Sequence, residues 1–277
     1  MKKGYKARPH DLSEVMTLLP DFVEIHASSE DLDKEINQDC TFIQMAVHLP
    51  EYDGSTLLDP ASNDPQMIER CVKFYNRALD VTRKWGENFR GTPKAVIHPG
   101  GWSNEPLKHW ERQGLYNAFK SFMGQLNVNG VDLLVENMPP HPMFYGGQWN
   151  CNIFCDPTEC LDYCVGNGWG FCLDVCHAAL YCNYVGKNIL EFMRKVRPII
   201  AHVHISDGKG TDGEGLQIGD GDMPMKEILK FLNPIQVAVI AEIWQGHKDN
   251  FAGMKLAWDR MEQILKESGG QTDGGIN

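Results

Sequence analysis

The stretch IIAHVHISDGKG, residues 199–210, decides the fold class of this chain. An apolar, β-branched run leads directly into His204, and a loop that contains two glycines follows it. A short apolar run bounded by turn residues is typical of a strand buried in a parallel sheet. An imidazole at the C-terminal end of such a strand lies where parallel α/β folds build their sites.

Five further segments repeat this design, each with an apolar run that ends at an ionisable or imidazole side chain. They are FIQMAVHLPEY (42–52), AVIHPGGW (95–102), VDLLVENMPP (131–140), GFCLDVCHAAL (170–180) and VAVIAEIWQG (237–246), with the polar residues His48, His98, Glu136, Asp174 and Glu242. With two more candidates near the N-terminus, the predicted strands are 4–7, 22–26, 41–48, 95–98, 132–136, 170–174, 200–205 and 236–243.

Helical spacing of apolar residues between these strands predicts helices over 64–85, 108–126, 157–165, 187–196, 225–231 and 250–267. Eight strands that alternate with helices indicate a (β/α)8 TIM barrel, with a doubly wound sheet as the competitor. A doubly wound sheet would carry GxGxxG after its first strand, and this chain does not. We therefore predict a single barrel domain over 1–267 and a disordered, glycine-rich tail over 268–277.

Composition narrows the classes of function. Of 277 residues, 42% are hydrophobic, while 26 Lys and Arg against 37 Asp and Glu give a formal charge of −11. The acidic balance argues against a broad nucleic-acid surface, so we do not expect a nucleic-acid partner. No apolar run is long enough for a membrane span, and MKKGYKARPH lacks the apolar stretch of a signal peptide. Nine cysteines, an odd number, fit reduced thiols and favour a cytoplasmic protein.

The six polar strand ends predict a metal site. A barrel brings the C-terminal ends of its strands to one mouth, where unpaired carboxylates would repel one another unless a cation neutralised them. A divalent metal is the simplest such cation. Mixed carboxylate and imidazole ligands suit Mn, Co, Zn, Fe or Mg, so the metal is not identified by its ligands.

The series HLP, HPGG, LVENMP, LDVCH, HVHISD and AEIW resembles the xylose isomerase-like TIM barrel superfamily, between about Phe22 and Trp244. This group combines sugar or sugar phosphate isomerases and epimerases with the endonuclease IV-type nucleases of AP endonuclease family 2. The resemblance implies a metal held by Glu136, Asp174, His204 and Glu242. It also implies that Glu136 and Glu242 act as acid and base on opposite faces of a carbohydrate substrate, and that His177 contacts that substrate.

The chemistry agrees with a metal-dependent isomerase or epimerase. A metal that chelates a hydroxyl and the adjacent carbonyl makes the α-proton removable by a carboxylate, and proton transfer then proceeds through an enediolate. The sequence does not choose between epimerisation and isomerisation. Other chemistry of the superfamily, such as a dehydratase or lyase, and a barrel that only binds a ligand also stay open.

The alternative function is an endonuclease IV-like phosphodiesterase that acts on abasic-site DNA. That branch uses three zinc ions and adds histidines on two early strands, which His48 and His98 match. Its third zinc needs His177 and an Asp-x-His pair, but KGTDGEGLQIGDGD (209–222) contains none. We predict that His48 and His98 hold a second metal, contact the substrate, or only hydrogen-bond to neighbouring carboxylates.

Several other side chains are candidates for substrate contact. Trp244, Trp102 and Tyr52 follow strand ends, Lys209 could contact a substrate phosphate or carboxylate, and the aromatic loop 139–151 suggests a lid or a sugar-stacking wall. Glu24 and His26 are expected on opposite faces of their strand, so that one of them could reach the mouth; a structural role is the alternative.

Two further groups are expected to be structural. His202 is predicted to be a core histidine below His204. Cys151, Cys155, Cys160 and Cys164 lack C-x2-C spacing and are expected to be ordinary thiols. A homo-oligomer is compatible with the sequence, but no interface signal stands out.

Overall fold

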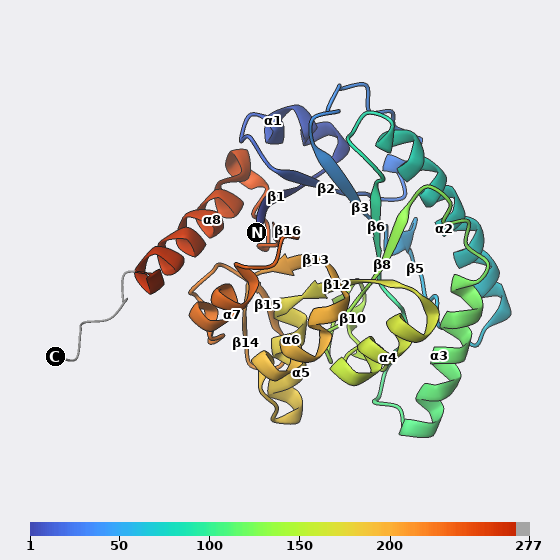
Figure 1. Cartoon of the computed structure of the whole chain (residues 1–277). Helices are drawn as coiled ribbons and strands as arrows, with labels where there is room; N and C mark the ends of the chain where they lie inside the picture. Colours follow the sequence, from blue (N-terminus) through green and yellow to red (C-terminus); the bar gives the residue numbers. More distant parts are fainter. Residues whose placement is uncertain (270–277) are drawn as a thin grey trace.

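Eight parallel strands close into a barrel in the spatial order β1-β16-β13-β12-β8-β6-β3-β2, as the computed structural model of residues 1–269 shows (Figure 1). The predicted TIM barrel is confirmed. The strands are β1 (Lys2–Ala7), β2 (Phe22–His26), β3 (Gln44–His48), β6 (Lys94–Ile97), β8 (Asp132–Glu136), β12 (Gly170–Asp174), β13 (Ile200–Ile205) and β16 (Ala238–Ala241).

Helices surround the strands and pack their apolar faces against them (Figure 1). Local sequence starts several of them; Asp64, for example, caps α2 by accepting a hydrogen bond from the backbone N–H of Gln66, with Pro65 at the first helical position. The helices are α1 (Leu12–Met16), α2 (Pro65–Gly86), α3 (His109–Met123), α4 (Pro157–Asn167), α5 (Val175–Val185), α6 (Ile189–Val196), α7 (Met225–Leu232) and α8 (Lys248–Gly269).

Two helices, α1 and α5, were not predicted. α1 has only five residues. α5 follows β12 without a loop, and its sequence VCHAALYCNYV is apolar over most of its length, so it shows little of the polar face that marks a surface helix. The predicted tail over 268–277 falls almost wholly on residues 270–277, which lie outside the described residues, while Ser268 and Gly269 end α8. Within residues 1–269, no helix is both long and apolar enough to cross a membrane.

The barrel interior changes from apolar to polar along the strands. Its lower part is filled by two small clusters: Phe22, Ala46, Ala238 and Ile240, and Val96, Leu134 and Cys172. Above them lie buried ionisable groups, among them Glu24, Glu136 and His204. Since buried ionisable groups are expensive unless they are paired, this upper layer points to function rather than to packing.

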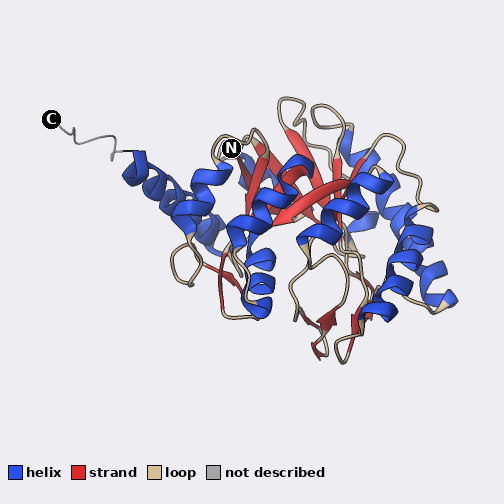
Figure 2. Cartoon of the chain, turned by 60° about the horizontal axis from the view of Figure 1, so that its bottom comes forward, coloured by secondary structure: helices blue, strands red, loops and turns tan. Residues whose placement is uncertain are grey.

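Register places the polar groups of neighbouring strands side by side. Glu136 pairs with Cys172, and an irregularity between Phe171 and Cys172 then sets Cys172 opposite His202 and Asp174 opposite His204. Short two-stranded antiparallel sheets follow the barrel strands. Three are hairpins: β4 (Tyr52–Asp53) with β5 (Thr56–Leu57), β9 (Met143–Phe144) with β10 (Gly147–Gln148), and β14 (Asp207–Lys209) with β15 (Gly213–Leu216). The fourth joins two loops, with β7 (Trp102–Ser103) paired to β11 (Asn150–Cys151). Figure 2 shows short strands of this kind projecting from one end of the barrel.

Candidate metal centre

A cavity of about 390 Å³ opens at the C-terminal ends of the barrel strands. Of the six predicted strand-end residues, all but His204 line this cavity, and His204 lies fully buried beside them. His177 and Trp244, also predicted site residues, line it as well. The mouth of the barrel therefore brings together most of the predicted site residues, which lie between His48 and Trp244 in the sequence.

Four predicted metal ligands meet in this cavity. Glu136, Asp174, His204 and Glu242 each offer one atom, and these four atoms lie within 4.8 Å of one another. Nδ1 of His204 is 3.3 Å from Oε1 of Glu136 and 3.0 Å from Oε2 of Glu242. Metal–ligand bonds of roughly 2.1 Å put opposite ligands about 4.2 Å apart, so the four atoms fit one ion after small adjustments.

Unsatisfied acceptor capacity in the site supports that fit. Oε2 of Glu136 is buried and accepts no hydrogen bond. Burial alone would raise the pKa of Glu136, but the neighbouring His204 and His98 hold this pKa well below its usual range. An ionised carboxylate with an unused oxygen is a suitable ligand for a divalent cation.

Asp174 is positioned by hydrogen bonds to the backbone around it. Its Oδ1 accepts from the backbone N–H of His177 at 2.7 Å, which caps α5, and the amide side chain of Asn137 pairs with its backbone N–H and C=O at 2.9 Å each. Burial raises the pKa of Asp174 to about 6, and Glu136 and Glu242 add to this rise. The other carboxylate oxygen, Oδ2, lies 3.8 Å from Nδ1 of His177, which also lines the cavity.

His177 stands between acceptors on both sides. Its Nδ1 is 3.0 Å from the carbonyl oxygen of Asn137, and its Nε2 is 3.5 Å from Oε2 of Glu214 on β15. Burial opposes the charged form, but Asp174, Glu214 and Glu136 together raise the pKa of His177 to about 10. Sequence reasoning missed Glu214, because the hairpin that carries it follows the strand end of His204 by ten residues.

A second group of donors lies next to the first. His48, Glu51 and His98 offer ligand atoms within 4.8 Å of one another, and Nε2 of both histidines is 3.4 Å from Oε2 of Glu136. Burial would raise the pKa of Glu51, but His48, His26 and His98 lower it to about 2. Glu51 stands three residues after His48 in the segment FIQMAVHLPEY. It was not among the predicted site residues, because it lies past the end of the strand.

Below the metal ligands lies a buried ionic network. Glu24 accepts hydrogen bonds from His202 and His204, and Lys6 contacts both Glu24 and Glu242. The prediction for His202 is confirmed, since it is a fully buried, hydrogen-bonded core residue. The prediction that Glu24 and His26 face opposite ways was wrong: residues two apart on a strand share a face, and His26 lines the cavity above Glu24.

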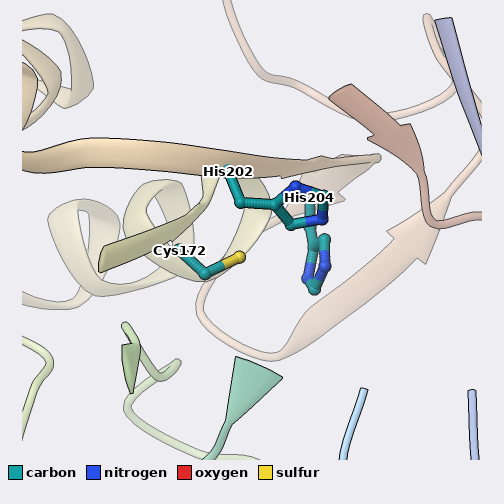
Figure 3. A group of neighbouring side chains, drawn as sticks. All are labelled: Cys172, His202 and His204. Atoms are coloured by element: carbon teal, nitrogen blue, oxygen red, sulfur yellow. The ribbon is translucent and has the colours of Figure 1, made fainter. Parts of the chain in front are cut away.

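Cys172, His202 and His204 form a third group whose ligand atoms come within 4.8 Å of one another. Figure 3 shows the sulfur of Cys172 on β12 pointing toward the two imidazoles on β13. Burial raises the pKa of the Cys172 thiol, and Nε2 of both histidines is already bonded to Glu24. A thiol that burial keeps protonated is a poor metal ligand, so we interpret this group as part of the core rather than as a metal site.

Aromatic side chains form the rim of the cavity. Trp244 is 75% exposed and Tyr145 is 87% exposed, yet both line the cavity together with Phe144 and Tyr52. Phe144 packs on Trp102 with ring centroids 4.7 Å apart. Lys209 is different, because it is exposed on β14 and lies outside the residues that line the cavity.

The cysteines of residues 151–164 stay free thiols. Cys155, Cys160 and Cys164 are buried, and none of the metal-competent groups found within residues 1–269 includes any of the four.

The chain belongs to the xylose isomerase-like TIM barrel family, whose sequence profile matches residues 14–266. It is 28% identical over 174 residues to the uncharacterised protein MJ1614 of Methanocaldococcus jannaschii, which covers 62% of this chain and 61% of that protein. The chain thus spans about three fifths of the length of the curated relatives it matches.

Two solved structures have the same fold over their whole length. A D-tagatose 3-epimerase-like protein superposes with a TM-score of 0.66 at 21% identity and covers 97% of this chain and 99% of that chain. An L-ribulose 3-epimerase superposes with a TM-score of 0.65 at 15% identity, and the match covers 100% of this chain and 99% of that chain. At these identities the likeness concerns the fold.

Proposed function

We propose that this protein is a divalent-metal-dependent isomerase or epimerase of a sugar or sugar phosphate. The observation that carries the proposal is that Glu136 and Glu242 both line the cavity and both contact Nδ1 of His204, at 3.3 and 3.0 Å. Of the two similar structures, one is named as an L-ribulose 3-epimerase and the other as a D-tagatose 3-epimerase-like protein, and these names suggest ketoses as the first compounds to test.

Glu136, Asp174, His204 and Glu242 would hold the metal, with Mn, Co, Mg or Zn as candidates. A bound divalent ion would polarise a substrate carbonyl and make the neighbouring C–H more acidic. Glu136 and Glu242 would remove and return that proton on opposite faces of the substrate, as the resemblance to the family implies. His177, His48, His98 and Trp244 would orient the substrate; Lys209 stays a predicted contact that depends on movement of its hairpin.

Proton exchange at carbon tests this proposal directly. The protein is incubated in D2O with Mn²⁺ and a panel of ketoses and their phosphate esters, and deuterium at the exchangeable carbon is followed by NMR. We expect exchange with at least one compound and a loss of at least about 100-fold in Glu136→Gln and in Glu242→Gln, the range expected of general acid–base groups. Glu87→Gln, an exposed carboxylate at the end of α2, is the matched control. Full turnover in Glu136→Gln would contradict the proposal.

A second candidate, the phosphodiesterase, is favoured by one observation: His48, Glu51 and His98 meet beside Glu136 as a second donor set. It predicts cleavage of a duplex that contains a tetrahydrofuran abasic-site analogue. A cytoplasmic location, a small-molecule carbohydrate as the main partner, and a homo-oligomeric state remain predictions from the sequence.

A further inference from the structure

Glu24 is a buried carboxylate that lies beneath the metal ligands and outside the cavity. Its side chain is fully buried, and its Oε2 accepts hydrogen bonds from Nε2 of His202 at 2.7 Å and from Nε2 of His204 at 2.8 Å. Its Oε1 lies 3.3 Å from the ammonium nitrogen of Lys6. Three donors thus converge on one carboxylate inside the barrel.

These partners fix a proton on one nitrogen of His204. An ionised carboxylate can only accept hydrogen bonds, and the adjacent Lys6 ammonium, itself buried, favours the ionised form. The proton in the bond between His204 and Glu24 must therefore sit on Nε2. Nδ1, the other nitrogen, lies 3.3 Å from Glu136 and 3.0 Å from Glu242, so it too can carry a proton in the metal-free protein. A bound metal would take the place of that proton on Nδ1, whereas the proton on Nε2 would stay in its bond with Glu24.

Lys6 closes this arrangement into a ring. It donates a hydrogen bond to Oε1 of Glu242, which directs the other oxygen of that carboxylate toward Nδ1 of His204. The ring Lys6–Glu24–His204–Glu242 draws on β1, β2, β13 and the residue that follows β16. Replacing a buried ion pair by apolar residues of the same size is often neutral or stabilising, so stability alone does not explain this one.

We propose that Glu24 is a positioning residue of the metal centre, which holds the proton of His204 on Nε2 and so presents Nδ1 to the metal. This inference rests on the proposed metal site. A carboxylate that accepts the second N–H of a metal-binding imidazole sets both the ring orientation and the tautomer.

Zinc affinity measured by competition with a chromophoric chelator tests the role of Glu24. In Glu24→Gln the amide keeps the size but loses the charge, and it cannot accept from both histidines while also facing Lys6 favourably. We expect a loss of Zn²⁺ affinity of about 10- to 100-fold. The matched control is His202→Gln, which perturbs the same carboxylate and the same buried layer but leaves the Glu24–His204 bond in place. A change of less than about threefold is expected there, with both variants checked for folding by circular dichroism.

A second readout does not depend on affinity. Histidine ¹⁵N NMR of the Zn²⁺-loaded protein should show His204 with a proton on Nε2 and a metal-shifted Nδ1. Wild-type affinity in Glu24→Gln, equal losses in both variants, or Nε2 coordination would overturn the inference. If the wild type binds no Zn²⁺, the proposed metal site fails instead, and the slowly exchanging Nε2 proton of His204 in the metal-free protein still reports whether Glu24 holds it.

Discussion

Nε2 of His48 lies 3.4 Å from Oε2 of Glu136, the buried carboxylate oxygen that accepts no hydrogen bond. His98 places its own Nε2 at the same distance from that oxygen. Oε1 of Glu136 meanwhile faces His204. Glu136 therefore stands between two donor sets, and the number of metal ions bound separates the two candidate functions.

The metal content of the protein is the first prediction. We expect about one equivalent of divalent metal per chain after purification without a tag or added metal, and we expect it to survive His98→Ala, because the four proposed ligands do not include His98. Inductively coupled plasma mass spectrometry of both proteins gives the count. Two or three equivalents of zinc or iron that fall in His98→Ala would make His98 a ligand and favour phosphoester hydrolysis.

Trp244→Ala should weaken substrate binding without affecting folding. The indole is mostly exposed, yet it lines the cavity. Its removal should therefore take away a surface on which a sugar can stack, while the packing of the core stays unchanged. We expect KM to rise about 5- to 30-fold, corresponding to roughly 1–2 kcal/mol, with little change in the melting temperature. Trp110→Ala, an exposed indole on α3, serves as the control. An unchanged KM in Trp244→Ala would remove this residue from the substrate site.

Much of the fold and of the metal centre could be predicted from the sequence, because one rule governs both. Each strand is a short apolar run, and in a parallel barrel the residue at its C-terminal end must come to the same mouth. Glu136, Asp174 and Glu242 could thus be placed together although they are distant in sequence. The resemblance to the family then separated the four metal ligands from His48 and His98.

Residues that the rule does not cover were missed for physical reasons. Lys6 lies on β1, whose sequence KKGYKA is too polar to stand out as a buried strand, and its ammonium is stabilised by carboxylates of other strands. Glu51 and Glu214 lie past the strand ends, and their positions depend on how the loops fold back over the cavity. Such loop geometry depends on tertiary contacts rather than on a periodic pattern.

Asn137→Ala should destabilise the protein and misplace Asp174. The fully buried amide of Asn137 pairs with both the N–H and the C=O of Asp174, so its loss removes two buried hydrogen bonds to that backbone. We expect about 2–4 kcal/mol less free energy of unfolding, together with weaker metal binding. Urea unfolding measures the first effect, and chelator competition measures the second. Asn76→Ala is the control, because the partly exposed amide of Asn76 bonds to the backbone of residues 125 and 127. We expect it to lower the free energy of unfolding clearly less than Asn137→Ala does. An equal loss in both variants would argue against a special role for Asn137.

His26 makes the stability of the protein dependent on pH. Burial, with Lys6 nearby, lowers the pKa of His26 to about 3, whereas an unfolded histidine titrates near 6.5. Between these values the unfolded state binds the extra proton, so stability falls as the pH drops from about 6.5 toward 3, by up to about 1.4 kcal/mol per pH unit. His26→Asn should lose this contribution, and its unfolding free energy should decline less steeply than that of the wild type over the same range. Urea titrations at pH 7.5, 6.0 and 5.0 give the unfolding free energy of both proteins as a function of pH. Carboxylates that titrate alike in both proteins contribute equally to the two slopes, so the difference between the slopes reports His26. Parallel slopes would mean that His26 is protonated in the folded protein, which its stacking on His48 at 5.2 Å between ring centroids makes unfavourable.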